Sequence, residues 1–290
     1  PTLSLLSGGK VSDYLRRVKG PDAYDRRTGG TSIEVRLMYG LNTTAAARTY
    51  TTTVPTTPQD GATLARFEWK HYNDSIVVFD HEIAMNAGEA QIINLMKFKT
   101  AQAEGSLRDI FNAGIFGTGT DGGTAISGFG NLFSTTLTAG GLAPGTHDWW
   151  IADVNTPSPT SFAANGIEEM RKIFVATKTL SDGSPANAIV TDNDTYNWYE
   201  ARLFNQVRFQ KGDDGLRAID PAYQHLLFSM TPVFPDKDCT AGYMYFLNTN
   251  FLKLAVLQDQ LFKVGPFVRP ENQRVQVALV NFTGNLITDN

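Results

Sequence analysis

Cysteine is almost absent from this sequence: the 290 residues contain one, Cys239. A single cysteine cannot close a disulfide within the chain, and it cannot supply the thiolates of a structural zinc site. This usage is typical of proteins that fold in a reducing compartment.

Long hydrophobic runs are absent as well. No stretch approaches the roughly 18 apolar residues that a membrane-spanning helix needs, so we expect no membrane contact. The composition, 42% hydrophobic and 19% charged, is that of a globular chain with ample material for a core. A length of 290 residues fits one large domain or two ordinary ones.

Residues that carry catalysis or bind metals are sparse. The four histidines are scattered, and His81-Glu82 lacks a second histidine at the zinc-protease spacing. No G-x-S-x-G motif occurs. Asp192, Asn193 and Asp194 resemble the start of a cation loop, but the glycine and glutamate required further on are missing, so helix capping is the better interpretation. We therefore expect no enzymatic activity, no cofactor and no metal.

Positive charge is missing from residues 109–170, which decides how a glycine-rich motif there is interpreted. Gly117 to Gly122 matches G-x-G-x-x-G, a pattern that binds phosphate when it follows a strand and begins a helix. Here it follows a predicted helix, and no lysine or arginine nearby could neutralise a phosphate. We interpret the glycines as a turn-rich connection. The aromatic run at 148–150 could stack on a base or a sugar, but packing within the protein is the simpler interpretation.

Charge is unevenly distributed along the chain. Residues 1–36 carry a net charge of +3, and the remainder carries −7. An acidic body does not fit a DNA-binding protein, which is strongly basic. The basic segment is either a solvated N-terminus or an arm that pairs with a neighbour.

The residues that are present predict an α+β fold. Residues 1–30 are punctuated by glycine, with one short helix expected around Val11–Val18. Two β-rich stretches then form a long hairpin with a Thr/Pro-rich tip at Thr51–Gly61, and "ARTYTTTVP" reads as part of a strand. Such a hairpin has too few large apolar residues near its tip to form its own core.

A long helix of about 25 residues is predicted next. It begins near Asn86 and Glu89, which resemble a capping box, and it ends at Gly114. Its expected apolar face is made of residues at helical spacing: Ile92, Met96, Ala103, Leu107, Ile110 and Phe111.

Two further helices and several strands follow. The helices are "SFAANGIEEMRKIFVATKTL" and "NDTYNWYEARLF", with the buried strand "NAIVTD" between them. The later strands are "HLLFSMTPVFP", "GYMYFLNT", "LFKVGPFV" and "RVQVALVNFTG".

The order of these parts resembles the major capsid proteins of tailed bacteriophages, whose Hong Kong 97 type fold is shared with encapsulins. "RFEWKHYNDSIVVFDHEIAMNAGE" is similar to the return strand of that family's extended loop and the entry to its spine helix. "IFNAGIFGTGTDGGTAISGFGNL" resembles the end of the spine helix, although Gly128-Phe129 replaces the usual Gly-Leu. "NAIVTDNDTYNWYEARL" resembles the axial domain's strand and helix.

The resemblance implies four parts. These are an N-terminal arm (1–31), an extended β-hairpin loop (32–79), a peripheral domain (80–135 and 255–272, with a spine helix at 89–113) and an axial domain (136–254 and 273–290). It implies a virion protein that assembles in the host cytoplasm into hexamers and pentamers around double-stranded DNA. Scaffolding, portal and decoration proteins are the implied partners, and the DNA would be contacted only non-specifically.

The arm and the extended loop are the expected inter-subunit contacts. For the loop tip these are Thr53, Val54, Pro55, Thr56 and Pro58, and for the arm Arg16, Arg17, Arg26 and Arg27. In the best-known member of the family, a lysine of this loop forms an isopeptide bond with a neighbour's asparagine. The tip here has no lysine, and the nearest, Lys70, reads as a solvated or salt-bridged strand residue. An encapsulin-like compartment and a soluble enzyme or binding protein are the alternatives.

Overall fold

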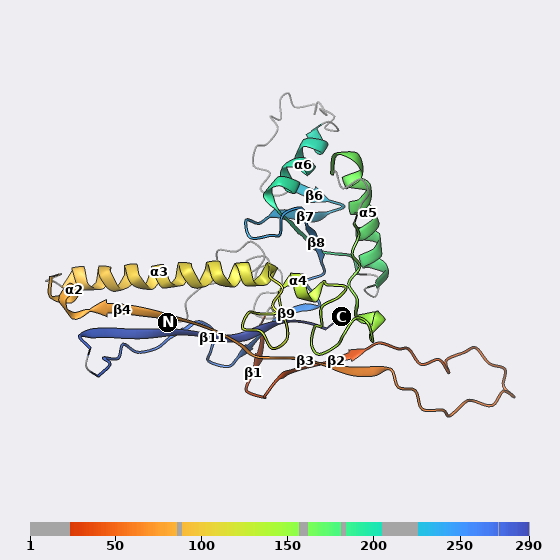
Figure 1. Cartoon of the computed structure of the whole chain (residues 1–290). Coiled ribbons are helices and arrows are strands. Elements are labelled where there is room, and N and C mark those ends of the chain that lie inside the picture. The colour runs from red at the N-terminus through yellow and green to blue at the C-terminus, as the bar shows by residue number, and fades with distance from the viewer. Residues whose placement is uncertain are drawn as a thin grey trace, which may run out of the picture.

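The computed structural model describes residues 24–85, 89–156, 162–180, 184–204, 226–271 and 273–289. Figure 1 shows three parts: a long helix lying along a sheet, a second sheet flanked by two helices, and a hairpin whose loop projects away from both. The short helix predicted around Val11–Val18 lies outside the described residues.

The hairpin consists of β2 (Ile33–Met38) and β3 (Ala62–Phe67), which pair antiparallel from Ile33↔Phe67 to Met38↔Ala62. Along β2 the side chains alternate between buried and exposed, as expected for a strand with one face on a core. Between the strands, residues 39–61 form no strand, so the prediction of strand in "ARTYTTTVP" is wrong. The threonine-rich stretch has no strand opposite it among the described residues, so it remains a loop.

The five-stranded sheet contains β1 (Tyr24–Arg27), β4 (Lys70–Phe79), β9 (Leu252–Leu257), β10 (Lys263–Val264) and β11 (Val275–Thr288). Its centre is β11, which pairs with β4 over ten residues and with β9 further along. This pairing corrects the grouping of 273–290 with 136–254, because β11 belongs to the sheet beside the long helix.

Residues 24–27 likewise join this sheet, because β1 pairs with β9 in parallel. The predicted N-terminal arm, 1–31, is therefore shorter than its sequence suggested. The strand β9 was not anticipated.

The long helix α3 (Glu89–Phe116) follows a short helix, α2 (Asp80–Met85), and lies along β4 and β11 (Figure 1). Leu107 and Phe111 pack from α3 into the core, where the Phe111 ring meets that of Phe282 on β11 at 5.1 Å. Ile110 is 57% exposed, so its assignment to the buried face is wrong.

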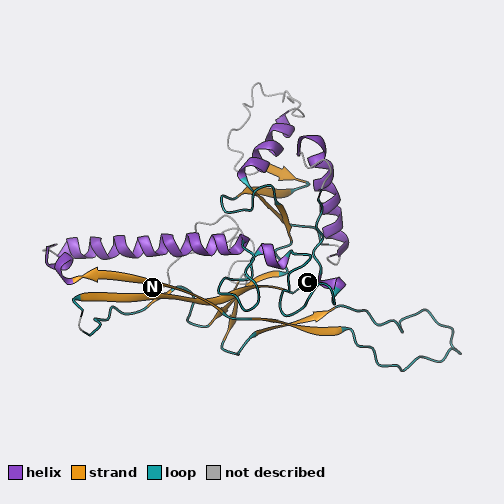
Figure 2. Ribbon diagram, viewed as in Figure 1, coloured by secondary structure: helices purple, strands orange, loops and turns teal. Residues whose placement is uncertain are grey.

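The second sheet has the order β6-β7-β5-β8, from β5 (Ala188–Thr191), β6 (Leu226–Phe228), β7 (Thr231–Pro235) and β8 (Met244–Leu247). The helices α5 (Phe162–Leu180) and α6 (Asn193–Phe204) accompany it, as Figure 2 shows. The stretch "HLLFSMTPVFP" is two strands, because Ser229 and Met230 adopt positive φ angles and turn the chain.

Two short elements complete the described chain: α4 (Phe129–Leu132) and the 3-10 turn Asp148–Trp150. The fold class is α+β, as predicted. Among the described residues, no helix is both long and apolar enough to cross a bilayer.

Candidate functional site

The loop between β2 and β3, residues 39–61, is here called the hairpin loop. It projects beyond the end of its two strands (Figure 1), and residues 45–60 are all exposed. Its apolar side chains are exposed too, with Leu41 at 83% and Val54 at 64%. A loop of this length without a core of its own is uncommon in a compact domain and is usually functional.

Hydrogen bonds within the hairpin loop hold its two sides together without burying them. At the base, the Tyr39 N–H donates to the Gly61 carbonyl (2.9 Å), and the Thr43 hydroxyl donates to Gln59 Oε1 (2.8 Å). Further out, the Arg48 guanidinium bridges the carbonyls of Thr44 and Thr53. These bonds define the loop's path, but its surface stays available to another molecule.

All five predicted tip residues lie in the exposed part of the hairpin loop: Thr53, Val54, Pro55, Thr56 and Pro58. Their contact with a neighbouring subunit stays a prediction. Of the predicted arm residues, Arg16 and Arg17 lie outside the described residues.

Arg26 and Arg27 lie in β1, not in the arm. The Arg27 guanidinium forms a salt bridge with Asp25 (2.9 Å) and donates to the Glu34 carbonyl (3.0 Å). Arg27 therefore serves its own chain, while Arg26 is exposed.

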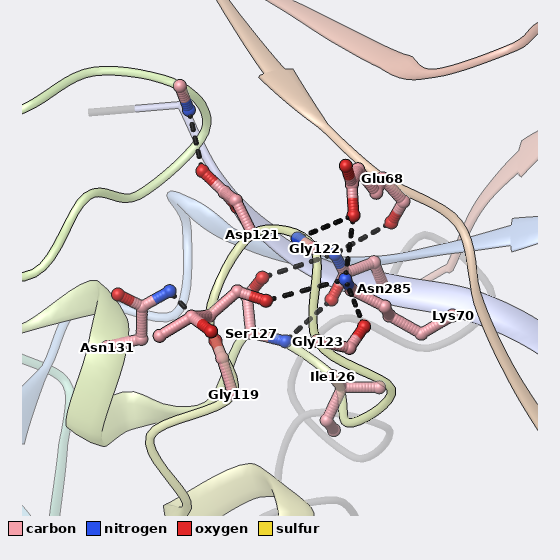
Figure 3. Close-up of polar contacts among 12 residues, drawn as sticks. Glu68, Lys70, Gly119, Asp121, Gly122, Gly123, Ile126, Ser127, Asn131 and Asn285 are labelled. Atoms are coloured by element: carbon pink, nitrogen blue, oxygen red, sulfur yellow. Dashed lines mark hydrogen bonds and ion pairs between the residues drawn. The ribbon is translucent and has the colours of Figure 1, made fainter.

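The root of the hairpin is fixed by a buried lysine. Lys70, the first residue of β4, is 2% exposed. Its ammonium group lies 3.0 Å from Glu68 Oε2 and donates to the carbonyls of Gly123 (2.7 Å) and Thr120 (3.4 Å). Figure 3 shows Lys70 between Glu68 and the glycine-rich loop. The interpretation of Lys70 as a salt-bridged strand residue is confirmed, and it is a buried one.

Glu68 completes this attachment from the other side. Its Oε2 also accepts the N–H of Gly122 at 2.7 Å. Its hydrogen bond to Lys70, then that from Gly122, lower the pKa of the Glu68 carboxyl from its usual 4.5. Glu68 and Lys70 thus clamp the glycine-rich loop, residues 117–128, against the start of β4.

Asn285 on β11 holds the same loop at a second point. Its Oδ1 accepts the N–H of Ser127 (2.8 Å), and its Nδ2 donates to the Glu68 carbonyl (2.9 Å) and to Ser127 Oγ (3.2 Å). Nothing local in the sequence pointed to Glu68 or Asn285 in this role, because the groups that they hold in the glycine-rich loop lie 54 or more positions away.

The glycines of this loop are required by close backbone packing. A Cβ at Gly119 would lie 1.9 Å from the Ile126 carbonyl oxygen, and one at Gly128 would lie 2.3 Å from that of Gly117. The loop follows the helix α3, and the Gly122 N–H is already bonded to a carboxylate. These contacts support the interpretation as a connection and leave no phosphate cradle at Gly122.

The other candidate groups are also engaged within the subunit. The Thr195 N–H meets Asp192 Oδ2 at 3.4 Å, which is the capping role predicted for Asp192 at the start of α6. Trp149 stacks on Tyr39 at 5.0 Å, and Trp150 Nε1 donates to the Ala139 carbonyl, so this pair packs as predicted.

Neither a reactive thiol nor a metal site is found in the described part of the chain. Burial raises the pKa of the Cys239 thiol to about 12, which makes the group unreactive at neutral pH. No cluster of three or more potential metal ligands occurs among the described residues.

Comparison of the whole fold with solved structures is decisive. The cyanophage A-1(L) capsid asymmetric unit superposes with a TM-score of 0.69 at 18% identity, covering 92% of this chain and 86% of that chain. The chain has the fold of a tailed-phage capsid subunit. The Hong Kong 97 type architecture expected from the order of parts is therefore confirmed.

Two further structures share this capsid fold. The capsid of an empty GTA particle matches with a TM-score of 0.57 at 14% identity, over 92% of this chain and 90% of that chain. The capsid of Myoviridae phage XM1 matches with a TM-score of 0.54 at 13% identity, over 95% and 88%. Comparison with protein-family models and with curated protein sequences gives no match.

Proposed function

We propose that this chain is the major capsid protein of a tailed phage, and that it self-assembles into the hexamers and pentamers of an icosahedral head around double-stranded DNA. The observation that carries the proposal is the hairpin loop. A loop exposed over residues 45–60 and anchored firmly only at its root is suited to contact another copy. The capsid fold supplies the geometry in which such contacts close a shell.

The parts of the capsid fold follow from this proposal. The five-stranded sheet with α3 is the peripheral domain, and the four-stranded sheet with α5 and α6 is the axial domain. The tip residues Thr53 to Pro58 and the arm's Arg16 and Arg17 contact neighbouring subunits.

The net charge supports a container. Residues 37–290 carry −7, so the packaged DNA is not bound tightly through counterion release. Assembly in the host cytoplasm with scaffolding, portal and decoration proteins belongs to the same proposal.

A shortened loop tests this function. Residues 44–58 are replaced by Asn-Gly, a two-residue turn that keeps the Thr43–Gln59 pair. Because the removed residues are almost all exposed, we expect an unchanged circular dichroism spectrum and melting temperature but loss of particles in negative-stain microscopy. Normal particles from this variant would contradict the proposal.

The contents of the particle distinguish a phage head from the encapsulin-like alternative. A phage head encloses DNA and carries a portal, whereas a cargo compartment encloses protein. Cryo-electron microscopy of purified particles distinguishes the two.

A further inference from the structure

One end of one face of the five-stranded sheet carries exposed apolar side chains, although Val275 at its margin is only 8% exposed. Ile76, Val78 and Ala278 are buried on the side of α3. Side chains alternate along a strand, so the residues between them face the opposite side. These include Phe79, which is 44% exposed, and Leu279, which is 51% exposed.

The strand register brings these residues into one surface. Val77 lies opposite Val277, and Val277 also pairs with Val268, which is 60% exposed. Leu279 and Phe79 lie at the neighbouring pairs on the same face. We call Val77, Phe79, Val268, Val277 and Leu279 the outer patch.

An open face of an antiparallel sheet is normally polar, and this one is polar further along. Asn73 lies opposite Asn281, which also pairs with Lys263. The apolar character is thus confined to one end of β4 and β11, where it marks an interaction surface.

The N-terminal segment supplies a matching surface in its sequence. Val11, Tyr14, Leu15 and Val18 follow the i, i+3, i+4, i+7 spacing of an amphipathic helix. On a helical wheel Arg16 and Arg17 fall away from that stripe. A segment of this length does not form a stable helix alone in water, so an apolar surface would be needed to stabilise one.

The distance from Tyr24 to the outer patch indicates which copy of the chain provides the Val11–Val18 segment. The described chain begins at Tyr24, which pairs with Leu254 and so lies two strands from Leu286 on β11. From there the outer patch is roughly 25 Å distant at Leu279 and nearly 40 Å at the level of Phe79, by strand rise and spacing. The six residues from Val18 to Tyr24 span at most about 20 Å, and they must also cross about 10 Å to pack on the face.

As a helix the segment itself adds about 10 Å, so a subunit's own segment reaches Leu279 but does not extend to Phe79. We infer that the outer patch receives the Val11–Val18 segment of a neighbouring copy, with that segment's Arg16 and Arg17 turned away from the sheet. The inference rests on the proposed function, since it requires assembled copies. It goes beyond that function because it identifies the surface of the neighbouring subunit that receives the segment.

Disulfide cross-linking tests the inference. Leu15→Cys and Leu279→Cys are combined in one chain, whose native Cys239 is buried. Assembled particles are oxidised and run on a non-reducing denaturing gel. Each copy both gives a segment and receives one, so we expect a ladder of covalent multimers. Val268→Cys is the second acceptor if Leu279→Cys prevents assembly.

The matched control pairs Leu15→Cys with Leu227→Cys. Leu227 is 54% exposed on β6 of the other sheet, close to the 51% of Leu279. We expect only monomer from the control, and equal ladders from both pairs would overturn the inference.

Three other results are distinguishable. Wild-type protein that forms no particles would refute the proposed function itself. Particles without a ladder, or with a bridge only inside the monomer, would refute this inference and leave the function standing. A ladder from Tyr50→Cys with Leu279→Cys, and none from Leu15→Cys, would show that the hairpin loop occupies the patch instead.

Discussion

Lys70 shows how much one residue can connect. Its ammonium group is buried, and a buried charge is tolerated only when it is paired and hydrogen-bonded. Glu68 supplies the countercharge, and the carbonyls of Thr120 and Gly123 complete the set. The ammonium group of this lysine, on the return strand of the hairpin, is therefore bonded entirely to groups of its own subunit.

Lys70→Met should destabilise the isolated subunit. The change leaves two carbonyls and a half-exposed carboxylate without their donor, at a cost of about 1–3 kcal/mol. Urea unfolding of unassembled subunits measures the free energy of unfolding. The matched control is Lys97→Met on the exposed side of α3, which should leave that free energy unchanged. Equal stability of both variants would show that the clamp contributes nothing.

At the scale of elements, α3 has a narrow buried stripe. Ala103, Leu107, Phe111 and Ile115 recur every four positions and are all buried, whereas Ile110 points to solvent. Periodicity predicted the helix and most of this stripe. It could not exclude Ile110, because three-residue and four-residue spacings both fit a helix and the packing partner on β11 decides between them.

Two substitutions on α3 test this face. Leu107→Asp places an unpaired charge in the core, at a cost of several kcal/mol, and should give insoluble or unassembled protein. Ile110→Asp places the same charge at a position where the native side chain is 57% exposed. This variant should keep a melting temperature within a few degrees of wild type. Solubility and thermal unfolding report the outcome, and the reverse order of effects would refute the assignment.

The edge of β4 that has no strand beside it in the described part of the chain also has a consequence for assembly. Its Val77 carbonyl accepts Lys99 Nζ (2.9 Å), its Phe79 N–H donates to Glu82 (3.4 Å), and its Ser75 N–H donates to Asp74 (2.8 Å). Side chains thus occupy backbone groups that an edge would offer to a foreign strand. Uncontrolled strand addition is hindered here, so contacts between copies are directed to other surfaces.

At the scale of the whole molecule, the sequence predicted local features better than distant pairings. The bounds of α6 agree with the structure to the residue, and the hairpin strands are close, because periodicity and turn residues are local. The parallel pairing of β1 with β9, and the partner of β11, depend on contacts across most of the chain. No local pattern encodes them.

A particle of this protein should be held together without covalent bonds. The hairpin loop contains no lysine, and Lys70 is buried among its own partners. Boiling mature particles in detergent should therefore release a single band at 31.8 kDa. A ladder of multimers that disappears in a Lys70→Ala variant would contradict this expectation.

The clamp formed by Glu68 and Lys70 also limits how accurately the tip of the hairpin loop can be positioned. From Glu68 to Tyr50, β3 and the hairpin loop together reach up to roughly 55–60 Å at about 3.3 Å per residue. At that distance a tilt of ~5° at the root moves the tip by ~5 Å, more than the full separation of two carbon atoms in contact. The accuracy with which the loop tip would meet a neighbouring copy therefore depends on the stiffness of the few hydrogen bonds that Glu68 and Lys70 make.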